Sequence, residues 1–144
     1  MIVPDANLLL YACDSGSPLH TRASSWWRQC LSGSETVGLT RPVIFAFMRL
    51  STSARVYIDP MTLAESAECI RSCLARRISQ VLQSPSEHVA RVVELLGAAG
   101  GAAGNPVTDV QIAALAISYR AVVHTADRDF LRFSDVRCHF PRDE

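Results

Sequence analysis

Residues 1–11 read MIVPDANLLLY, and this opening stretch decides the fold class. Residues 1–4 form a short apolar run typical of a buried strand, whereas the pattern of residues 8–11 is better suited to a helix. Between them, residues 5–7 (Asp-Ala-Asn) favour a turn. The sequence therefore predicts a strand, a turn and a helix in immediate succession.

The same alternation of strands and helices continues along the rest of the chain. Helices are expected at residues 20–31, 43–50, 59–78, 85–96 and 105–119, with one more turn of helix at 127–132. Strands are expected at residues 36–39, 81–82, 121–125 and 136–140. Because strands alternate with helices throughout, the sequence predicts an α/β fold in which helices cover both faces of a central parallel sheet.

Proline and polar residues mark the start of two of these helices. Residues 59–60 (Asp-Pro) supply an N-cap and a first-turn proline, and the apolar stripe that follows starts at Leu63. Residues 84–85 (Ser-Pro) begin another helix, and its spacing predicts an apolar stripe of Val89, Val92, Val93 and Leu96.

The composition is that of an ordinary globular chain. The 144 residues are 49% apolar and 19% charged, which is typical of one folded domain spanning residues 1–144. The 14 acidic residues balance 14 basic ones, so nucleic-acid binding must come from a local patch rather than from overall charge. All the basic residues are arginine. Without lysine, the chain has no phosphate-binding P-loop, no Schiff-base chemistry and no receiver-domain phosphorylation site.

Cysteine usage and hydropathy indicate the compartment. The five cysteines form an odd set without a C-x-x-C pair, and a reduced, cytoplasmic setting is the simplest expectation. The sequence contains no run of about 18 apolar residues, which is the length needed to cross a bilayer. No membrane association is therefore expected.

Three aspartates occupy equivalent places in the predicted fold. Asp5 directly follows the first strand, Asp127 closely follows the strand at residues 121–125, and Asp109 lies in the opening turn of the helix after glycine-rich residues 97–104. Because the carboxyl ends of parallel strands share one edge of the sheet, these residues are expected to converge there. Taken singly, each has an ordinary structural explanation, since aspartate is favoured at helix N-termini.

Converging carboxylates point to a metal ion. Like charges raise one another's pKa, so a site that keeps several carboxylates ionised generally needs a cation. Oxygen ligands favour Mg²⁺ or Mn²⁺, and either ion can activate water for phosphodiester hydrolysis. The residues predict a metal-dependent nuclease or phosphatase. A haloacid-dehalogenase-like phosphatase is the less favoured alternative, because it needs an aspartate where Asn7 stands and a lysine that the chain lacks.

The chain resembles PIN-domain ribonucleases, and specifically the VapC toxins of VapBC toxin–antitoxin systems, in three segments that share their order and spacing. These are IVPDANLLLYA (2–12), PVTDVQIAALAISYRA (106–121) and HTADRDF (124–130). The resemblance covers nearly the whole chain. It implies a PIN-like three-layer α/β/α fold, endonucleolytic cleavage of RNA with Mg²⁺ or Mn²⁺, a homodimer and inhibition by a cognate VapB antitoxin.

The resemblance also implies roles for individual residues. Asp5, Asp109 and Asp127 match the family's catalytic and metal-binding acids, and Asn7 and Thr125 match positions that support them. These roles are expectations carried over by motif.

One position departs from the family pattern. VapC toxins commonly carry a glutamate within a stretch such as E-F-L-R, and here the matching residues 46–49 read AFMR, with Ala46 in its place. Asp129, two residues beyond Asp127, is the preferred replacement as a fourth metal-binding acid. The alternative interpretation is a catalytically degenerate PIN domain that serves as an RNA- or antitoxin-binding module.

Substrate and partner contacts are expected from arginines and from large apolar residues. RNA approaches an acidic site against its own repulsion, so guanidinium groups are expected on its phosphates, with Arg49 and Arg128 as candidates. The early helices carry more large apolar surface than one side of a small sheet needs. At least half should be core, and the rest is expected to form a dimer surface or an antitoxin groove. The residues concerned are Trp26, Trp27, Phe45, Phe47 and Met48.

Overall fold

The computed structural model describes residues 1–99 and 107–141, and within these ranges the chain forms one five-stranded sheet. The strands are β1 (Ile2–Pro4), β2 (Val37–Leu39), β3 (Ser79–Val81), β4 (Val122–His124) and β5 (Arg137–His139). Their order is β3-β2-β1-β4-β5, and every neighbouring pair is parallel. In the central strand, Ile2 lies opposite Val37 on one side and Val122 on the other. The predicted parallel sheet is confirmed.

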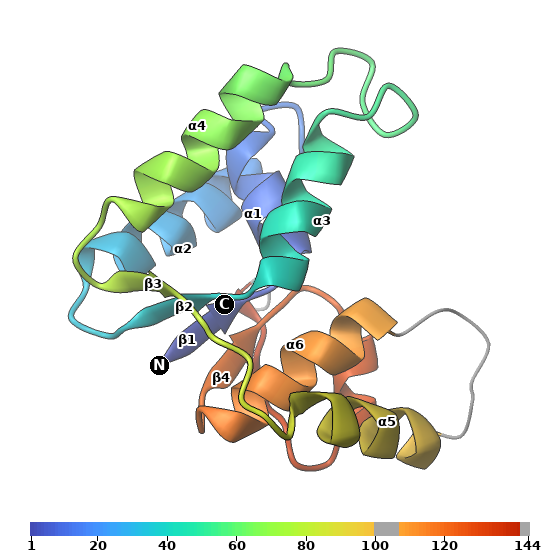
Figure 1. The fold of residues 1–144 in the computed structure, drawn as a ribbon. Helices are drawn as coiled ribbons and strands as arrows, with labels where there is room; N and C mark the ends of the chain where they lie inside the picture. The colour runs from blue at the N-terminus through green and yellow to red at the C-terminus, as the bar shows by residue number, and fades with distance from the viewer. Residues whose placement is uncertain (100–106, 142–144) are drawn as a thin grey trace.

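Helices cover both faces of this sheet (Figure 1). In the described residues they are α1 (Ala6–Cys13), α2 (His20–Ser32), α3 (Arg41–Ser51), α4 (Leu63–Leu74), α5 (His88–Ala98), α6 (Val107–Ser118) and the short 3₁₀ helix η1 (Arg128–Arg132). Helices α1 to α4 lie on one side of the strands and α5 and α6 on the other, which confirms the three-layer α/β/α prediction. Within the same two ranges, no helix has the length and apolar character needed to span a membrane.

The central strands of the sheet are buried because helices pack on both faces. All residues of β1 and β2 are buried, and Val3, Leu39 and Val123 have no exposed surface. Gly38 in β2 has a specific packing role, because a Cβ at this position would lie 2.8 Å from the Leu82 side chain. A larger residue there would have to displace Leu82 from the core.

The strand order creates a switch point at the carboxyl ends of β1 and β4. From β1 the chain builds outward through β2 to β3, and it then crosses over to add β4 and β5 on the other side of β1. The backbone hydrogen bonds continue one residue past the strands. Asp5 N–H donates to His124 O (2.8 Å), and Thr125 N–H donates to His139 O (3.0 Å). Open parallel sheets bind their ligands at such switch points.

Helix α4 begins three residues later than the sequence pattern predicts. Its N-cap is Thr62 rather than Asp59: the Thr62 hydroxyl accepts a hydrogen bond from Glu65 N–H, and the Glu65 carboxylate accepts one from Thr62 N–H at 2.7 Å. This capping box satisfies two backbone donors at the helix start. Leu63, predicted to begin the buried stripe, is 66% exposed at the first helical position, and the helix ends at Leu74.

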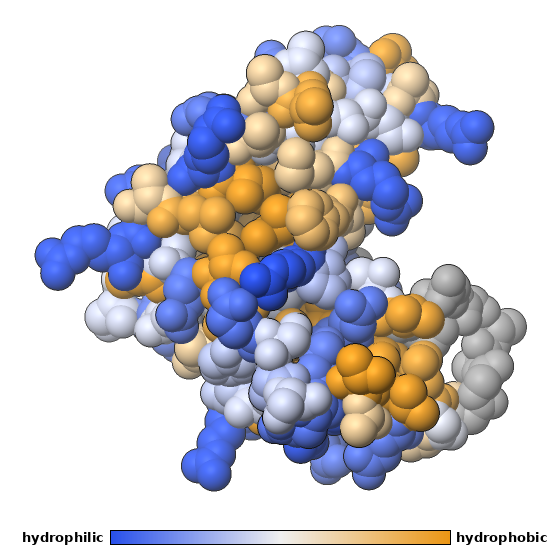
Figure 2. Space-filling model, in the orientation of Figure 1, coloured by the Kyte–Doolittle hydropathy of each residue, from blue (hydrophilic) through white to orange (hydrophobic). Residues whose placement is uncertain are grey.

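Helix α5 packs only part of its predicted apolar stripe, Val92 and Leu96, against the core. Val89 and Val93 are 72% and 63% exposed, whereas Val92, Leu95 and Leu96 pack against the core. The neighbour of α5 is α6, and one helix covers a narrower stripe than a sheet does. Figure 2 shows the apolar surface that remains over α5.

Candidate active site

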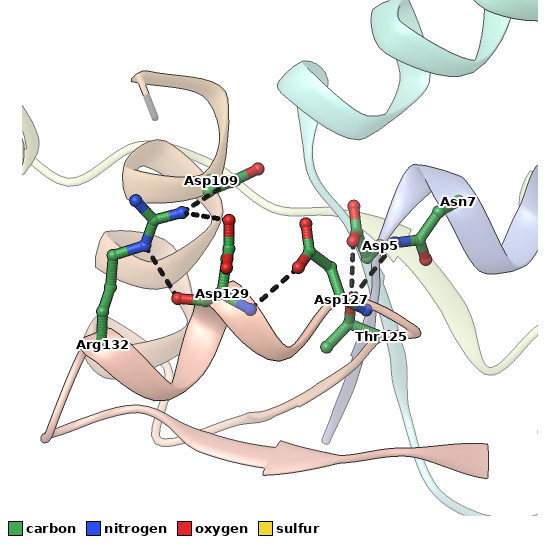
Figure 3. A network of polar contacts seen from close by, with 7 residues as sticks. All are labelled: Asp5, Asn7, Asp109, Thr125, Asp127, Asp129 and Arg132. Carbon is green, nitrogen blue, oxygen red and sulfur yellow. Dashed lines mark hydrogen bonds and ion pairs between the residues drawn. The ribbon is translucent and has the colours of Figure 1, made fainter. Parts of the chain in front are cut away.

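Asp5 is held at the switch point by hydrogen bonds to both carboxylate oxygens. After Pro4 ends β1, Asp5 becomes the N-cap of α1, and its Oδ1 accepts a hydrogen bond from Ala6 N–H at 2.7 Å. Its Oδ2 accepts a hydrogen bond from the Thr125 hydroxyl, also at 2.7 Å. Asp5 is only 7% exposed. The fold thus buries a carboxyl group in one orientation at the end of the central strand (Figure 3).

The cost of this burial shows in the pKa of Asp5. Burial raises the pKa from its ordinary value of 3.8 to about 6, although the hydrogen bonds from Thr125 and Ala6 act in the opposite direction. The negative charges of Asp109 and Asp127 raise it further. Negative charge is therefore concentrated around Asp5, which is the electrostatic condition that favours binding of a cation.

Thr125 ties Asp5 to Asp127. Its buried hydroxyl donates to Asp5 Oδ2 and accepts a hydrogen bond from Asp127 N–H at 2.9 Å. Asn7 Nδ2 lies 3.4 Å from the same hydroxyl, and Asn7 Oδ1 accepts a hydrogen bond from Ala126 N–H at 3.3 Å. The hydroxyl therefore uses its donor and both acceptor positions. The hydrogen bonds of Asn7 and Thr125 thus connect Asp5 with the segment that carries Asp127.

Asp127 comes after β4 and is the N-cap of η1. Its Oδ1 accepts a hydrogen bond from Asp129 N–H at 2.8 Å, which caps the first turn of the 3₁₀ helix. The Asp127 side chain is half-buried, and Figure 3 shows it beside Asp5. The second acid of the predicted cluster thus lies next to the first.

Asp109 reaches the same edge from the first turn of α6. Burial raises the pKa of Asp109, the charge of Asp127 raises it further, and the guanidinium of Arg132 lowers it. Asp109 Oδ2 lies 3.8 Å from Arg132 Nη2. The third predicted acid therefore shares the electrostatic surroundings of the other two, with an arginine beside it.

Asp129, expected as a fourth metal-binding acid, faces Arg132. Its side chain is 72% exposed, and its Oδ2 lies 3.2 Å from Arg132 Nη2. Arg132 Nε–H also donates to the carbonyl oxygen of Asp129 at 2.8 Å. The Asp129 carboxylate is thus engaged in an ion pair at the rim of the acidic cluster.

The donor set of the cluster fits a hard divalent cation. Asp5, Asp109 and Asp127 offer oxygen ligands only, and these suit Mg²⁺ or Mn²⁺. Within residues 1–99 and 107–141, however, no three carboxylate, thiol or imidazole groups lie close enough together to hold a metal ion as they stand. All three acids can therefore contact one ion only after side-chain adjustment; Figure 3 shows Asp109 with one carboxylate oxygen beside Arg132.

Ala46 stands beside this edge, on α3. It lines a hollow of about 340 Å³ between α3 and α6, together with Thr108, the residue before Asp109. Position 46, where a glutamate was expected, therefore borders a hollow that also contacts the residue before Asp109. With alanine at this position, no carboxylate from residue 46 enters the hollow.

The two arginines expected to contact RNA are both exposed. Arg49 lies in the wall of the hollow that Ala46 lines. Arg128 lies at the start of η1, directly after Asp127, and its guanidinium is 4.9 Å from the centre of the Phe140 ring.

The large apolar residues of the early helices divide between core and surface. Trp26, Trp27 and Phe47 are buried, and Met48 is half-buried against the core. Phe45 is 64% exposed. Of the five residues considered for a partner surface, Phe45 is the one that presents most of its side chain to solvent.

Sequence reasoning missed the histidines that end β4 and β5. The carbonyl oxygen of His124 accepts a hydrogen bond from Asp5 N–H, and that of His139 accepts one from Thr125 N–H. The centroids of the two histidine rings lie 4.5 Å apart. Trp26 Nε1–H donates to His124 Nδ1 at 3.0 Å, and burial, with a smaller effect of His139, lowers the pKa of His124 to about 4. The signal that could have found them is position, since each is the last residue of a strand beside the site.

Comparison with known proteins identifies the family and its members. The family model described as PIN domain matches residues 2–136. Ribonuclease VapC33 of Mycobacterium tuberculosis is 41% identical over 137 residues, which cover 95% of this chain and 95% of that protein. Ribonuclease VapC37 of the same species is 33% identical over 141 residues, covering 98% of this chain and 97% of that protein.

A solved structure agrees with this comparison. VapBC2 from Rickettsia felis, bound to a DNA fragment from their promoter, matches with a TM-score of 0.69 over 96% of this chain and 98% of that one. The two sequences are 18% identical. At this identity the similarity shows the fold, and it is the three-layer fold described above.

Proposed function

We propose, since this chain belongs to the PIN-domain family and is an endoribonuclease toxin of the VapC type, that it hydrolyses RNA phosphodiester bonds at the switch-point edge of its sheet. The observation that carries this proposal is the gathering of Asp109 and Asp127 near Asp5, a buried carboxyl group with a pKa of about 6. Such a concentration of charge destabilises the fold and is typical of functional sites.

The metal we propose is Mg²⁺ or Mn²⁺, held by Asp5, Asp109 and Asp127. PIN-domain ribonucleases generally depend on a divalent metal, and the oxygen-only donor set supports these two ions over zinc. When bound, such an ion lowers the pKa of water and stabilises negative charge on phosphoryl oxygens. Asp129 is a candidate fourth ligand by sequence, but its ion pair with Arg132 favours another role.

The chain's own residues orient the reacting groups. Thr125 and Ala6 N–H hold the two oxygens of Asp5, and the same Thr125 hydroxyl holds the backbone of Asp127. Because these hydrogen bonds exist before substrate binds, Asp5 and Asp127 need little rearrangement during catalysis. Above about pH 6 Asp5 is ionised and able to serve as a ligand.

Partners follow from the exposed residues and from the family. We propose Arg49 and Arg128 as contacts for RNA phosphates, because both are exposed near the acids. We propose a VapB-type antitoxin as the protein partner, since the Rickettsia felis structure of the same fold is a VapBC assembly. Phe45 offers an exposed apolar contact for the antitoxin or for a second copy of this chain in a homodimer.

Ala46 favours a second candidate function. Without the glutamate common in VapC toxins, the site has fewer carboxylate ligands, and a degenerate PIN domain that only binds RNA or an antitoxin would show the same fold. The buried, hydrogen-bonded Asp5 supports the catalytic proposal, because a chain that had lost catalysis gains nothing from its cost in stability.

RNA cleavage by metal-stripped protein separates the two functions. We expect fragments of total cellular RNA with added Mn²⁺, none with EDTA, and a loss of at least about 100-fold in Asp5→Asn. Asp135→Asn, which neutralises an exposed carboxylate, should cleave normally. Equal cleavage by Asp5→Asn and wild type would remove the catalytic proposal. An inactive wild type that still binds RNA or antitoxin would favour the binding module.

A further inference from the structure

Arg132 takes no part in the mechanism proposed above, yet its side chain joins two elements of the site. It ends η1 and is 24% exposed. Its Nε–H donates to the Asp129 carbonyl oxygen at 2.8 Å, and its Nη2 lies 3.2 Å from Asp129 Oδ2. The same Nη2 lies 3.8 Å from Asp109 Oδ2 on α6. The guanidinium also packs over Phe133, 5.5 Å from the ring centre.

These contacts complete a series of polar interactions that runs across the whole site (Figure 3). In order, the residues joined are Asp5, Thr125, Asp127, Asp129, Arg132 and Asp109. The series links three separate parts of the chain: the end of β1, the loop between β4 and η1, and the start of α6. Through Arg132, the carboxylate of Asp109 is connected to the segment that carries Asp127.

The pairing with Asp129 decides how Arg132 affects an incoming cation. A lone guanidinium beside the acids would repel a metal ion, but the Asp129 carboxylate at 3.2 Å offsets its charge. The pair therefore contributes little net charge. Its contribution is orientation, because the hydrogen bond to the Asp129 backbone and the packing on Phe133 restrict the guanidinium to one place.

We propose that Arg132 is a positioning residue, anchored by Asp129, that orients the Asp109 carboxylate for metal binding. The proposal rests on the proposed function, and it assigns Asp129 to anchoring Arg132 rather than to holding the metal. Side chains that orient a metal ligand typically contribute roughly ten- to hundredfold to metal affinity.

Mn²⁺ affinity of the metal-stripped full chain, measured by calorimetry or by the electron paramagnetic resonance of free Mn²⁺, tests this without reference to catalysis. Arg132→Gln is expected to weaken Mn²⁺ binding roughly tenfold. Arg28→Gln changes an exposed arginine on α2 in the same way and should leave the affinity within about twofold. Unchanged binding by Arg132→Gln would overturn the proposal. Tighter binding would also overturn it, by showing that the guanidinium competes with the ion.

Asp129→Asn tests the anchor and replaces the first test if Arg132→Gln does not fold, as judged by circular dichroism. Alone, it should weaken Mn²⁺ binding by roughly three- to tenfold. In the Arg132→Gln background it should add about twofold or less, because both changes break the same series of contacts. A further tenfold loss in that background would mean that Asp129 itself binds the ion, contrary to the proposal.

The two proposals fail in distinguishable ways. A wild-type chain that binds no Mn²⁺ and cleaves no RNA overturns the proposed function and the role of Arg132 together. A wild-type chain that binds Mn²⁺ as tightly as Arg132→Gln overturns the role of Arg132 alone, and the acidic site stands without it.

Discussion

The two halves of the acidic site are held in place by different interactions. Asp5 and Thr125 are buried and joined by a hydrogen bond of 2.7 Å. Asp109 and Asp129 are more exposed, and Arg132 pairs with them at 3.8 and 3.2 Å. The buried half is fixed before any ligand arrives and destabilises the fold, whereas the exposed half, held by ion pairs at the surface, costs little stability. The difference indicates that the cost of the site in stability lies mainly at Asp5.

The largest predicted effect is a difference in unfolding free energy between the Asp5→Asn and Asp109→Asn variants. Because burial raises the pKa of Asp5 from 3.8 to about 6, ionising it at pH 7.5 costs the metal-free fold about 3 kcal/mol. Asp5→Asn is therefore expected to raise the free energy of unfolding by about 2 kcal/mol in urea titrations. Asp109→Asn, in the exposed half, should change it by less than about 1 kcal/mol. Equal effects of the two substitutions would break the comparison.

Proton linkage gives this prediction a pH dependence. The folded pKa of Asp5 lies above its ordinary value, so its penalty is absent below about pH 4 and grows until the pH passes 6. For His124 the folded pKa of about 4 lies below the ordinary 6.5, so the stability it contributes is lost as the pH falls from 6.5 to 4. The two effects oppose each other in the wild type. Asp5→Asn should therefore lose stability more steeply on acidification, and parallel curves for the two proteins would contradict this account of Asp5.

A smaller effect is expected from Thr125→Val, which keeps the shape of the buried side chain and removes its hydroxyl. Asp127 N–H then loses its acceptor and Asp5 loses a donor. We expect a loss of about 1.5 kcal/mol in unfolding free energy and roughly tenfold slower RNA cleavage. Thr52→Val, which removes a hydroxyl bonded to Met48 O at the end of α3, should leave cleavage unchanged. Normal cleavage by Thr125→Val would mean that the fixed half has no catalytic importance.

Ala46→Glu tests whether the open side of the site accepts another acid. The hollow that Ala46 lines leaves room for a glutamate, and a further oxygen ligand should tighten Mn²⁺ binding by roughly tenfold. Calorimetry on the metal-stripped protein measures the change. Ala54→Glu adds the same charge at an exposed position after α3 and should have little effect. If both variants bind Mn²⁺ alike, the gain comes from overall charge and not from the site.

The smallest effect is expected for the proposed RNA contacts. Arg49→Gln should weaken binding of single-stranded RNA about threefold in EDTA and lower the slope of log affinity against log salt by about 1. Arg71→Gln removes an exposed arginine paired with Glu68 on α4 and serves as the matched control. Fluorescence anisotropy over a range of salt concentrations measures both quantities. A salt slope equal to that of the wild type would remove Arg49 from the RNA contacts.

Sequence could predict the location of the site but not its internal pairings. Asp5 directly follows β1 and Thr125 directly follows β4, and the topology of a parallel sheet brings strand ends to one edge. The contact of Arg132 with Asp109 depends on how η1 docks beside α6, which no local pattern encodes. A side-chain pair between distant segments is set by packing, and so it became visible only in the structure.

The start of α4 shows that two competing helix-start patterns were present in the sequence. Asp59 followed by proline is a common helix start. The helix begins instead at the capping box of Thr62 and Glu65, an S/T-x-x-E pattern, because both of these side chains hydrogen-bond the helix backbone. On α5, the apolar spacing identified a helix but not which of its valines would be covered, since α6 covers only a narrow stripe. Local patterns predicted the elements better than their contacts.

The metal site can be tested most directly by paramagnetic broadening in the nuclear magnetic resonance spectrum of the metal-stripped protein during a Mn²⁺ titration. We predict that the amide signals of Ala6, Val110 and Arg128 broaden first, because each follows one of the three aspartates, while the signal of Glu65 on α4 persists. Broadening that spreads evenly over exposed carboxylates, or that spares the residues around Asp5, would contradict a shared metal site.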